Sequence, residues 1–326
     1  MNRKIALVTG GYSGEAEISY KTAMAIEKNI DRTRWDIFTI DIRKDGWFYL
    51  APDGSEAPVD KNDFSLAVNG QKLVFDAVFI ALHGTPGEDG KLQGYFDCIK
   101  IPYSSCDAAT SALTFNKRYT VAVASFAGMP VARSLHLFRH VPFSTDTILS
   151  ELTLPLFVKP NNGGSSIGMS KVKAAADLPE ALQKAFHEDD QVLVEEFISG
   201  REFTIGVFRS KGKIIALPIT EIIPKNEFFD FDAKYKGASE EITPAIVEDE
   251  IAEKIRATAC KAYAIFNCNG IVRMDYIYDK KAGQPFLLEI NTVPGQTEES
   301  LVPQQVRAMG MTLMEFYSLL IDECFN

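Results

Sequence analysis

Near the C-terminal end of the chain, two runs of residues alternate between polar and apolar side chains and could bind a metal ion. Within the segment 270–292, the first run contains Arg273 and Asp275, and the second contains Glu289 and Asn291. Side chains of a β-strand point alternately to its two faces, so the two polar residues of each run share a face. If the strands pair with these faces aligned, two carboxylates, an amide and a guanidinium converge. Three oxygen ligands on rigid strands suit Mg²⁺, which completes its shell with water and phosphate oxygens.

A simpler interpretation is a pair of amphipathic strands with one face in water, and alternation alone usually means no more than that. Here the polar positions hold short carboxylates and an amide, which form strands poorly, instead of Thr or Lys. Leu288 and Ile290 are expected on the face opposite to these groups. The residue types therefore favour a metal site with Asp275, Glu289 and Asn291 as ligands.

A second candidate site is the glycine-rich turn that follows Lys159. Glycine permits backbone conformations that bring N–H groups close to phosphate, so the turn and its lysine could bind a nucleotide. A P-loop does not fit, because Met169 stands where that motif requires lysine. Residues 164–168 match the GxSxG elbow of hydrolases, but that elbow leads into a helix, whereas Ile167–Val172 has the pattern of a strand. A plain hairpin is the alternative, and it leaves Lys159 without a role.

The apolar segments of the chain predict the elements that hold these residues. Strands at 4–9, 35–42 and 76–82 and a helix at 17–30 favour a parallel, doubly wound N-terminal domain, while 51–63 is predicted to be a loop or weak hairpin. The middle of the chain has a mixed α+β pattern. Further strands are expected at 155–160, 167–172, 191–197, 202–209, 213–223, 270–278 and 285–291, and helices at 115–127, 177–187, 249–265 and 312–323. Domain boundaries near residues 105 and 195 give three units, 1–105, 106–194 and 195–326.

Composition excludes several classes of function. The net charge of −10 argues against a nucleic-acid surface. No apolar stretch reaches the length of a membrane span, and the apolar run behind the N-terminal lysine is too short for a signal peptide, so we expect a cytoplasmic protein. Five cysteines with wide spacing and no CxxC pair indicate neither a disulfide framework nor a zinc site. Residues 10–14 fail the GxGxxG pattern of dinucleotide dehydrogenases.

Taken together, these segments resemble the D-alanine–D-alanine ligase family of the ATP-grasp superfamily, from Ile5 to about Asp322. Single motifs would be weak, but the combination is specific. The matching stretches are Gly10–Ser19, Ala81–Gly90, Val158–Pro160 with Gly164–Gly168, Ala233–Tyr235, Arg273–Asp275, Glu289–Thr292 and Ser300–Pro303. The resemblance implies an ATP-grasp fold of α/β and α+β parts, with an N-terminal Rossmann-like (pre-ATP-grasp) domain. ATP is then expected between the central and C-terminal units.

The resemblance also implies a reaction: two D-alanines are joined through a D-alanyl phosphate, for the synthesis of peptidoglycan precursors. The expected cofactors are ATP and two Mg²⁺ ions, with Mn²⁺ as a possible substitute, and the expected assembly is a homodimer. By resemblance, the nucleotide contacts are made by Lys117, Lys159 and Lys234 at the phosphates, by Glu195 at the adenine, by Glu202 at the ribose and by Ser166, and the metal is bound by Asp275, Glu289 and Asn291. Glu15 is expected to bind the ammonium group of the first D-alanine and to be linked to Ser165 and Tyr235, with His83 nearby. Arg273 and the Gly295 backbone are expected to form an oxyanion site, and Ser300 and Leu301 to line the site of the second D-alanine.

The sequence departs from the family pattern at a few positions. Glu196 stands where a lysine that contacts adenine is common, and Glu298 and Glu299 add negative charge near the second substrate site. Alternative activities are ligation of D-alanine to D-lactate or D-serine, or nucleotide binding by a non-catalytic regulator. Tyr235 argues against the D-lactate enzyme, Leu301 argues against the D-serine enzyme, and the complete metal set argues against the regulator.

Overall fold

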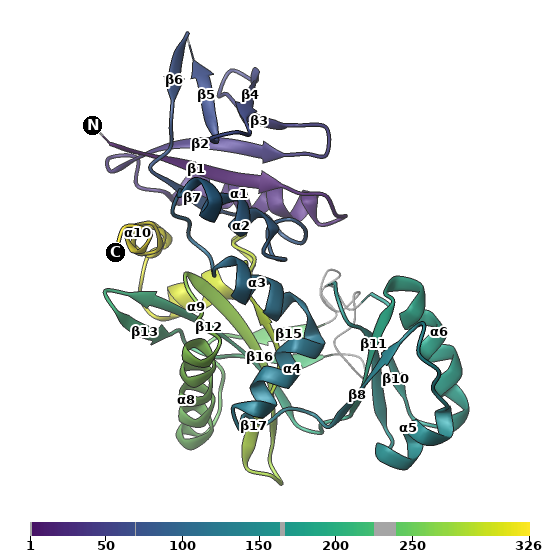
Figure 1. Cartoon of the computed structure of the whole chain (residues 1–326). Helices are drawn as coiled ribbons and strands as arrows, with labels where there is room; N and C mark the ends of the chain where they lie inside the picture. The colour runs from purple at the N-terminus through teal and green to yellow at the C-terminus, as the bar shows by residue number, and fades with distance from the viewer. Residues whose placement is uncertain (1, 69, 164–166, 225–238) are drawn as a thin grey trace.

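The computed structural model describes residues 2–68, 70–163, 167–224 and 239–326 and contains three β-sheets arranged along the chain (Figure 1). Within those ranges, no helix combines the length and the apolar character needed to cross a membrane.

The N-terminal sheet has seven strands in the order β6-β5-β4-β3-β2-β1-β7. Strands β1 (Arg3–Gly10), β2 (Trp35–Ile42) and β7 (Ala77–Ile80) are parallel, as predicted. The prediction of a wholly parallel sheet is wrong beyond β2, because tight turns connect the next strands as antiparallel hairpins. These strands are β3 (Trp47–Leu50), β4 (Glu56–Asp60), β5 (Ser65–Val68) and β6 (Gln71–Leu73), so the expected weak hairpin at 51–63 is a turn followed by β4.

Helices cover both faces of this sheet. Ile5 and Leu7 of β1 pack with α1 (Ala16–Asn29), and Ala6 and Val8 pack on the side of α2 (Lys91–Ile99). This alternation follows from the two-residue period of a strand and makes β1 apolar on both faces.

The central sheet is antiparallel, in the order β10-β9-β11-β8. Its strands are β8 (Ser134–Phe138), β9 (Leu156–Pro160), β10 (Ser170–Val172) and β11 (Gln191–Glu196). The helices α5 (Thr145–Glu151) and α6 (Leu178–Glu188), with the short helix η1 (Ala175–Asp177), lie beside it. Leu156, Val158 and Val194 pack in one core with residues of α5 and α6. The intervening residues therefore point to the other face of the sheet.

The C-terminal sheet has the order β15-β14-β12-β16-β17, with β13 added beside β12. Its strands are β12 (Arg201–Ser210), β13 (Lys213–Ala216), β14 (Thr220–Pro224), β15 (Ser239–Ile242), β16 (Ile271–Asp279) and β17 (Gln284–Asn291), and α8 (Asp249–Ile265) packs on it. The predicted single strand at 213–223 is two strands. They pair with different parts of β12, and Leu217 lies between them, where its N–H donates to the Gly206 carbonyl at 2.8 Å.

The predicted helix at 115–127 is two helices, α3 (Ala108–Phe115) and α4 (Lys117–Phe126). The break is at Asn116, which has an extended backbone and accepts a hydrogen bond from the Tyr119 N–H. Both helices pack on the C-terminal core, where Ala124 is fully buried with Val272. The segment between the N-terminal and central sheets thus belongs by packing to the C-terminal sheet, and the boundary at residue 105 stays a prediction.

Two helices near the C-terminus connect the first and last sheets. The helix α9 (Leu301–Ala308) was not predicted, whereas α10 (Leu313–Glu323) agrees with the predicted helix at 312–323. Val306 and Phe316 share a core with Ile26 of α1. This shared core fixes α1 and α9 relative to each other, and with them the expected substrate-binding residues at their starts, Glu15, Ser300 and Leu301.

Candidate functional site

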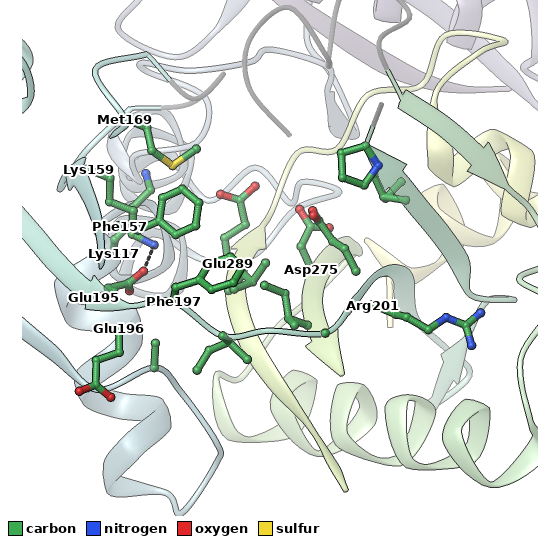
Figure 2. A pocket seen from close by; sticks show the side chains of 18 of the residues that line it. Lys117, Phe157, Lys159, Met169, Glu195, Glu196, Phe197, Arg201, Asp275 and Glu289 are labelled. Carbon is green, nitrogen blue, oxygen red and sulfur yellow. Dashed lines mark ion pairs between the residues drawn. The ribbon is translucent and has the colours of Figure 1, made fainter. Parts of the chain in front are cut away.

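A cleft of about 360 Å³ lies between the central and C-terminal sheets. Figure 2 shows Lys117, Lys159 and Glu195 on one side of it and Asp275 and Glu289 on the other. Its walls also contain apolar side chains, among them Phe157, Met169, Phe197, Ile198, Ile223, Ile277 and Leu288. An apolar cleft with a few charged groups at one end is typical of a site for a nucleotide or a similar ligand.

Strands β16 and β17 bring the predicted metal-binding residues together. Arg273 pairs with Asn291, and Asp275 pairs with Glu289. The prediction that these polar faces align is therefore confirmed.

One detail of the hairpin was predicted incorrectly. The strand register shifts at Asp275/Tyr276, so Leu287, not Leu288, is opposite Tyr276. Leu287 and Ile290 are buried in the core, while Leu288 lines the cleft beside Glu289. A bulge of this kind redirects the side chain of one extra residue, which simple alternation cannot predict.

The guanidinium of Arg273 bonds to both carboxylates. Its Nη2 lies 3.0 Å from Asp275 Oδ2 and 3.3 Å from Glu289 Oε1, and its Nε donates to Asp275 Oδ1 at 3.1 Å. Burial disfavours the charged guanidinium, but the two carboxylates outweigh it and raise the pKa of Arg273 above its ordinary value. Arg273 therefore carries a permanent positive charge at the edge of the cleft.

The donors on this hairpin fit a hard divalent cation. Asp275 and Glu289 offer carboxylate oxygens, and Asn291 offers an amide oxygen that also accepts from the Val293 N–H at 3.0 Å. Thr204 donates its hydroxyl proton to Asp275 Oδ1 at 2.5 Å and orients that carboxylate. In the part of the chain that the structure describes, no three His, Cys, Asp or Glu side chains gather into a metal site by themselves. The expected site thus depends on the amide of Asn291.

Lys159 and Glu195 form an ion pair on the central sheet. Lys159 Nζ lies 2.6 Å from Glu195 Oε2, and their side chains are only 11% and 10% exposed. Both lie on the face opposite to the Leu156 and Val158 core, because they occupy the alternate positions of β9 and β11. The sequence assigned these residues to different parts of a nucleotide and did not predict that they pair.

Lys117 begins α4 and reaches the glycine turn, where its Nζ donates to the Gly163 carbonyl at 2.6 Å. Gly163 and Gly168 have φ angles of 98° and 73°, which favour glycine. Beyond the turn the chain enters strand β10 at Ser170 and not a helix, which disfavours the hydrolase elbow.

Three further acidic residues line the cleft, Glu196, Glu202 and Glu221. Glu202 is the second residue of β12. Glu196 lies one residue after Glu195, and its Oε1 accepts from the Thr153 N–H at 2.8 Å. Figure 2 shows the Glu196 carboxylate directed away from Lys159. The carboxylate of Glu196, which stands where a lysine is common in the family, is therefore directed away from Lys159.

The residues expected at the first D-alanine lie close together at the start of α1. A Cβ added to Gly84 would lie 2.6 Å from Glu15 Oε2, so the Glu15 carboxylate contacts the backbone next to His83. His83 is buried, and its Nε2 lies 2.9 Å from the Thr22 hydroxyl. The neighbouring Ser19 hydroxyl accepts from the His83 N–H at 2.9 Å.

Glu88 is a member of this group that the sequence did not single out. Its Oε2 accepts from the Gly84 N–H at 2.9 Å, and its Oε1 lies 3.8 Å from His83 Nδ1. Its charge also raises the pKa of Arg273, so it lies near the metal-site residues. The only available signal was its place in the glycine-rich segment Ala81–Gly90.

The residues expected at the second substrate lie at the start of α9. Ser300 precedes the helix, and its Oγ accepts from the Thr297 N–H at 3.0 Å. A Cβ on Gly295 would lie 2.8 Å from the same oxygen, so Gly295 and Ser300 are neighbours. Leu301 is the first residue of α9 and is half-buried.

Glu298 near this site pairs with Lys28 at 2.9 Å, and the hydrogen bond from Lys28 lowers the pKa of its carboxyl. Ser165, Ser166, Lys234 and Tyr235 lie outside the described residues. The expected link from Glu15 through Ser165 to Tyr235 and the role of each site residue stay predictions.

The sequence is similar to known protein families over nearly its whole length. Residues 4–106 match the family description "D-ala D-ala ligase N-terminus", and residues 122–322 match "D-ala D-ala ligase C-terminus". A D-alanine–D-alanine ligase of Flavobacterium johnsoniae is 45% identical over 98% of this chain and 98% of its own. One from Parabacteroides distasonis is 45% identical over 99% of this chain and 98% of its own.

Solved structures of similar proteins have the same fold. A D-Ala:D-Ser ligase from Enterococcus faecalis has a TM-score of 0.89 at 31% identity, over 99% of this chain and 100% of that one. A D-alanine–D-alanine ligase from Bacillus anthracis, complexed with ATP, has a TM-score of 0.80 at 26% identity, over 99% of this chain and 97% of that one.

Proposed function

The chain belongs to the D-alanine–D-alanine ligase family of ATP-grasp enzymes, and we propose that it uses ATP to join two molecules of D-alanine through a D-alanyl phosphate. The observation that carries the proposal is one cleft in which Asp275 and Glu289 lie opposite Lys117 and Lys159. Such a cleft can hold a polyphosphate between fixed cations and metal-binding carboxylates.

The first step transfers the γ-phosphoryl group of ATP to the carboxylate of the first D-alanine. A carboxylate is a poor acyl donor, and phosphorylation gives it a good leaving group. Lys117 at the start of α4 and Lys159 on β9 neutralise phosphate charge from the same side of the cleft. Asp275, Glu289 and Asn291 would hold the two Mg²⁺ ions that the family implies, and these ions would supply positive charge against the phosphate oxygens.

We assign the binding of the first D-alanine to the residues near the start of α1. Glu15 binds the ammonium group of the first D-alanine, and His83, held by Thr22, lies beside it. In the second step the amine of the second D-alanine attacks the acyl phosphate and releases phosphate. Arg273 and the Gly295 backbone stabilise the oxyanion of the tetrahedral intermediate.

The acyl phosphate must be protected from water, so a covering segment is needed. We assign this role to residues 228–237, which contain Lys234 and Tyr235 and lie outside the described residues. Ile223 and Pro224, the described residues nearest before this segment, both line the cleft. The product would serve peptidoglycan precursor synthesis in the cytoplasm, and the family indicates a homodimer.

The similarity to a D-Ala:D-Ser ligase makes D-serine the principal alternative second substrate. Leu301 favours D-alanine, because an apolar, half-buried side chain offers no partner to a substrate hydroxyl. Phosphate release from ATP, measured with D-alanine, D-serine and D-lactate singly and in pairs, separates the alternatives. We expect release with D-alanine and little D-alanyl-D-lactate. ATP binding without any release would indicate a non-catalytic regulator.

A further inference from the structure

Asn161 follows strand β9 directly and connects it to the first turn of α4. Its N–H donates to the Gln191 carbonyl at 3.0 Å, which keeps it in line with the central sheet. Its carbonyl accepts from the Lys117 N–H at 3.2 Å, and its side-chain Oδ1 accepts from the Arg118 N–H at 2.8 Å. The residue is 1% exposed, so these bonds are shielded from water.

These bonds satisfy the donors that a helix leaves free at its start. The first N–H groups of an α-helix have no partner within the helix. In α4 the N–H groups of Lys117 and Arg118 bond to Asn161, and that of Tyr119 bonds to the Asn116 side chain at 3.2 Å. Two of the N–H groups at the start of α4 therefore bond to a residue that follows a strand of the central sheet.

The two elements that Asn161 joins pack in different bodies, although their lysines, Lys117 and Lys159, lie on the same side of the cleft. The strand β9 is in the central sheet and carries Lys159. The helix α4 packs on the C-terminal core, and close to its end the Pro130 carbonyl accepts from the Leu287 N–H of β17 at 2.9 Å. Asn161 therefore links the two bodies between which the ligand lies.

The same linkage holds the beginning of the glycine turn. Lys117 Nζ donates to the Gly163 carbonyl at 2.6 Å. From the other side, Asp189 Oδ2 accepts from the Asn162 N–H at 2.7 Å and from its side-chain Nδ2 at 2.8 Å. The turn is thus fixed at Asn162 and Gly163, between α4 and the loop before β11.

We propose that Asn161 is a positioning residue that fixes α4 to strand β9, so that Lys117 and Lys159 have the correct separation for phosphate before ATP binds. The proposal rests on the assignment of these lysines to ATP. Because Asn161 is buried, it acts through Lys117 and does not contact the nucleotide itself. Its Nδ2 has no hydrogen-bond partner among the described residues, so the Oδ1 acceptor carries the role.

The tests are hydrogen exchange of single amides without ligand and calorimetric titration with Mg·ATP. We expect Asn161→Ala to accelerate exchange of the Arg118 amide at least about tenfold while amides of α8 stay unchanged. Losing a helix-capping acceptor costs about 0.5–2 kcal/mol, so the dissociation constant of ATP should rise about 2- to 30-fold. Asn161→Asp, which keeps an acceptor oxygen, should retain slow exchange at Arg118.

The matched control is Asp107→Ala, which removes the side chain that caps α3 through the Thr110 N–H at 2.7 Å. It should leave ATP affinity within about twofold of the wild type. ATP affinity of Asn161→Ala within twofold of the wild type, or an equal loss in the control, would overturn the proposal. If the alanine variant does not fold, Asn161→Leu fills the same space without an acceptor and is judged by the same criteria.

A failure of the proposed function can be distinguished from a failure of the role proposed for Asn161. A wild-type protein that does not bind ATP contradicts the ligase assignment and removes the proposed purpose of the linkage.

The KM for D-alanine at saturating ATP should not change in Asn161→Ala. A parallel rise in both KM values would indicate general damage to the protein and would also overturn the positioning role.

Discussion

Asp275 and Glu289 lie opposite each other on strands β16 and β17, and both carboxylates bond to the guanidinium of Arg273. One arginine thus compensates two acidic groups that would otherwise repel each other. We expect a cation bound at these carboxylates, as proposed above, to compete with these bonds and to free the guanidinium for the substrate. The predictions below test this arrangement and the lysines opposite it.

Glu289→Gln should abolish turnover without unfolding the protein. The substitution removes a carboxylate from the proposed metal site but keeps the size and hydrogen-bonding capacity of the side chain. We expect the rate to fall on the order of 100-fold or more, because charge neutralisation at the transferring phosphate is lost. Steady-state rates across a Mg²⁺ titration are the measurement, with Glu253→Gln on the exposed face of α8 as the control. Near-normal activity at saturating Mg²⁺ would show that Glu289 does not bind the metal.

Lys159→Ala should weaken both ATP binding and folding. It leaves the buried Glu195 carboxylate without its partner at 2.6 Å, and breaking a buried ion pair typically costs about 3–5 kcal/mol. The double variant Lys159→Ala/Glu195→Gln should recover most of the stability, because no unpaired charge remains, but should not recover ATP affinity. Urea unfolding and calorimetry measure the two effects separately. Unchanged ATP affinity in the single variant would mean that the turn is only a hairpin.

Lys28→Gln should raise the KM for the second D-alanine about twofold at low ionic strength. The substitution removes the cation that pairs with Glu298 and leaves that negative charge uncompensated near the second substrate site. Both side chains are well exposed, so the effect should be small and should disappear at high salt. Glu298→Gln in the Lys28→Gln background should restore the wild-type KM. A rise in KM that persists in 0.5 M salt, where the Debye length is only about 4 Å, would exclude this electrostatic cause.

Stability should fall as the pH is lowered from about 7 toward 5.5, and His136 should contribute to the fall. Burial lowers the pKa of His136, and the nearby Arg118 lowers it further, although Glu195 opposes this. Between the lowered folded pKa and the ordinary value of 6.5, the unfolded chain binds more protons, so acid favours unfolding. His136→Gln should flatten the pH dependence of the free energy of unfolding across this interval. An identical slope in the variant and the wild type would contradict the expectation.

The sequence predicted those features that depend on local patterns. Alternation with apolar neighbours indicated that Arg273 shares a face with Asp275 and that Glu289 shares a face with Asn291, and the pairing of β16 with β17 aligns these faces. The helix at 249–265 was predicted to the residue. The resemblance assigned Ser300 and Leu301 to the second D-alanine site, which stays a prediction, and the helix α9 that begins there was not predicted.

Features that depend on tertiary register were not predictable. The bulge that brings Leu288 into the cleft, the Lys159–Glu195 ion pair and the position of Glu88 arise from pairing between segments far apart in sequence. Similarly, the extended backbone at Asn116 divides a segment with good helical periodicity, because its side chain starts a new helix.

The most direct test of the central claim is the fate of the carboxylate oxygen of D-alanine. Activation as an acyl phosphate transfers one carboxylate oxygen to phosphate when the second amine displaces it. With D-alanine labelled with ¹⁸O in both carboxylate oxygens, mass spectrometry of the released phosphate should show one ¹⁸O atom per phosphate, together with D-alanyl-D-alanine. Dipeptide formation with unlabelled phosphate would contradict activation of the carboxylate by ATP, and labelled phosphate without dipeptide would contradict the choice of second substrate.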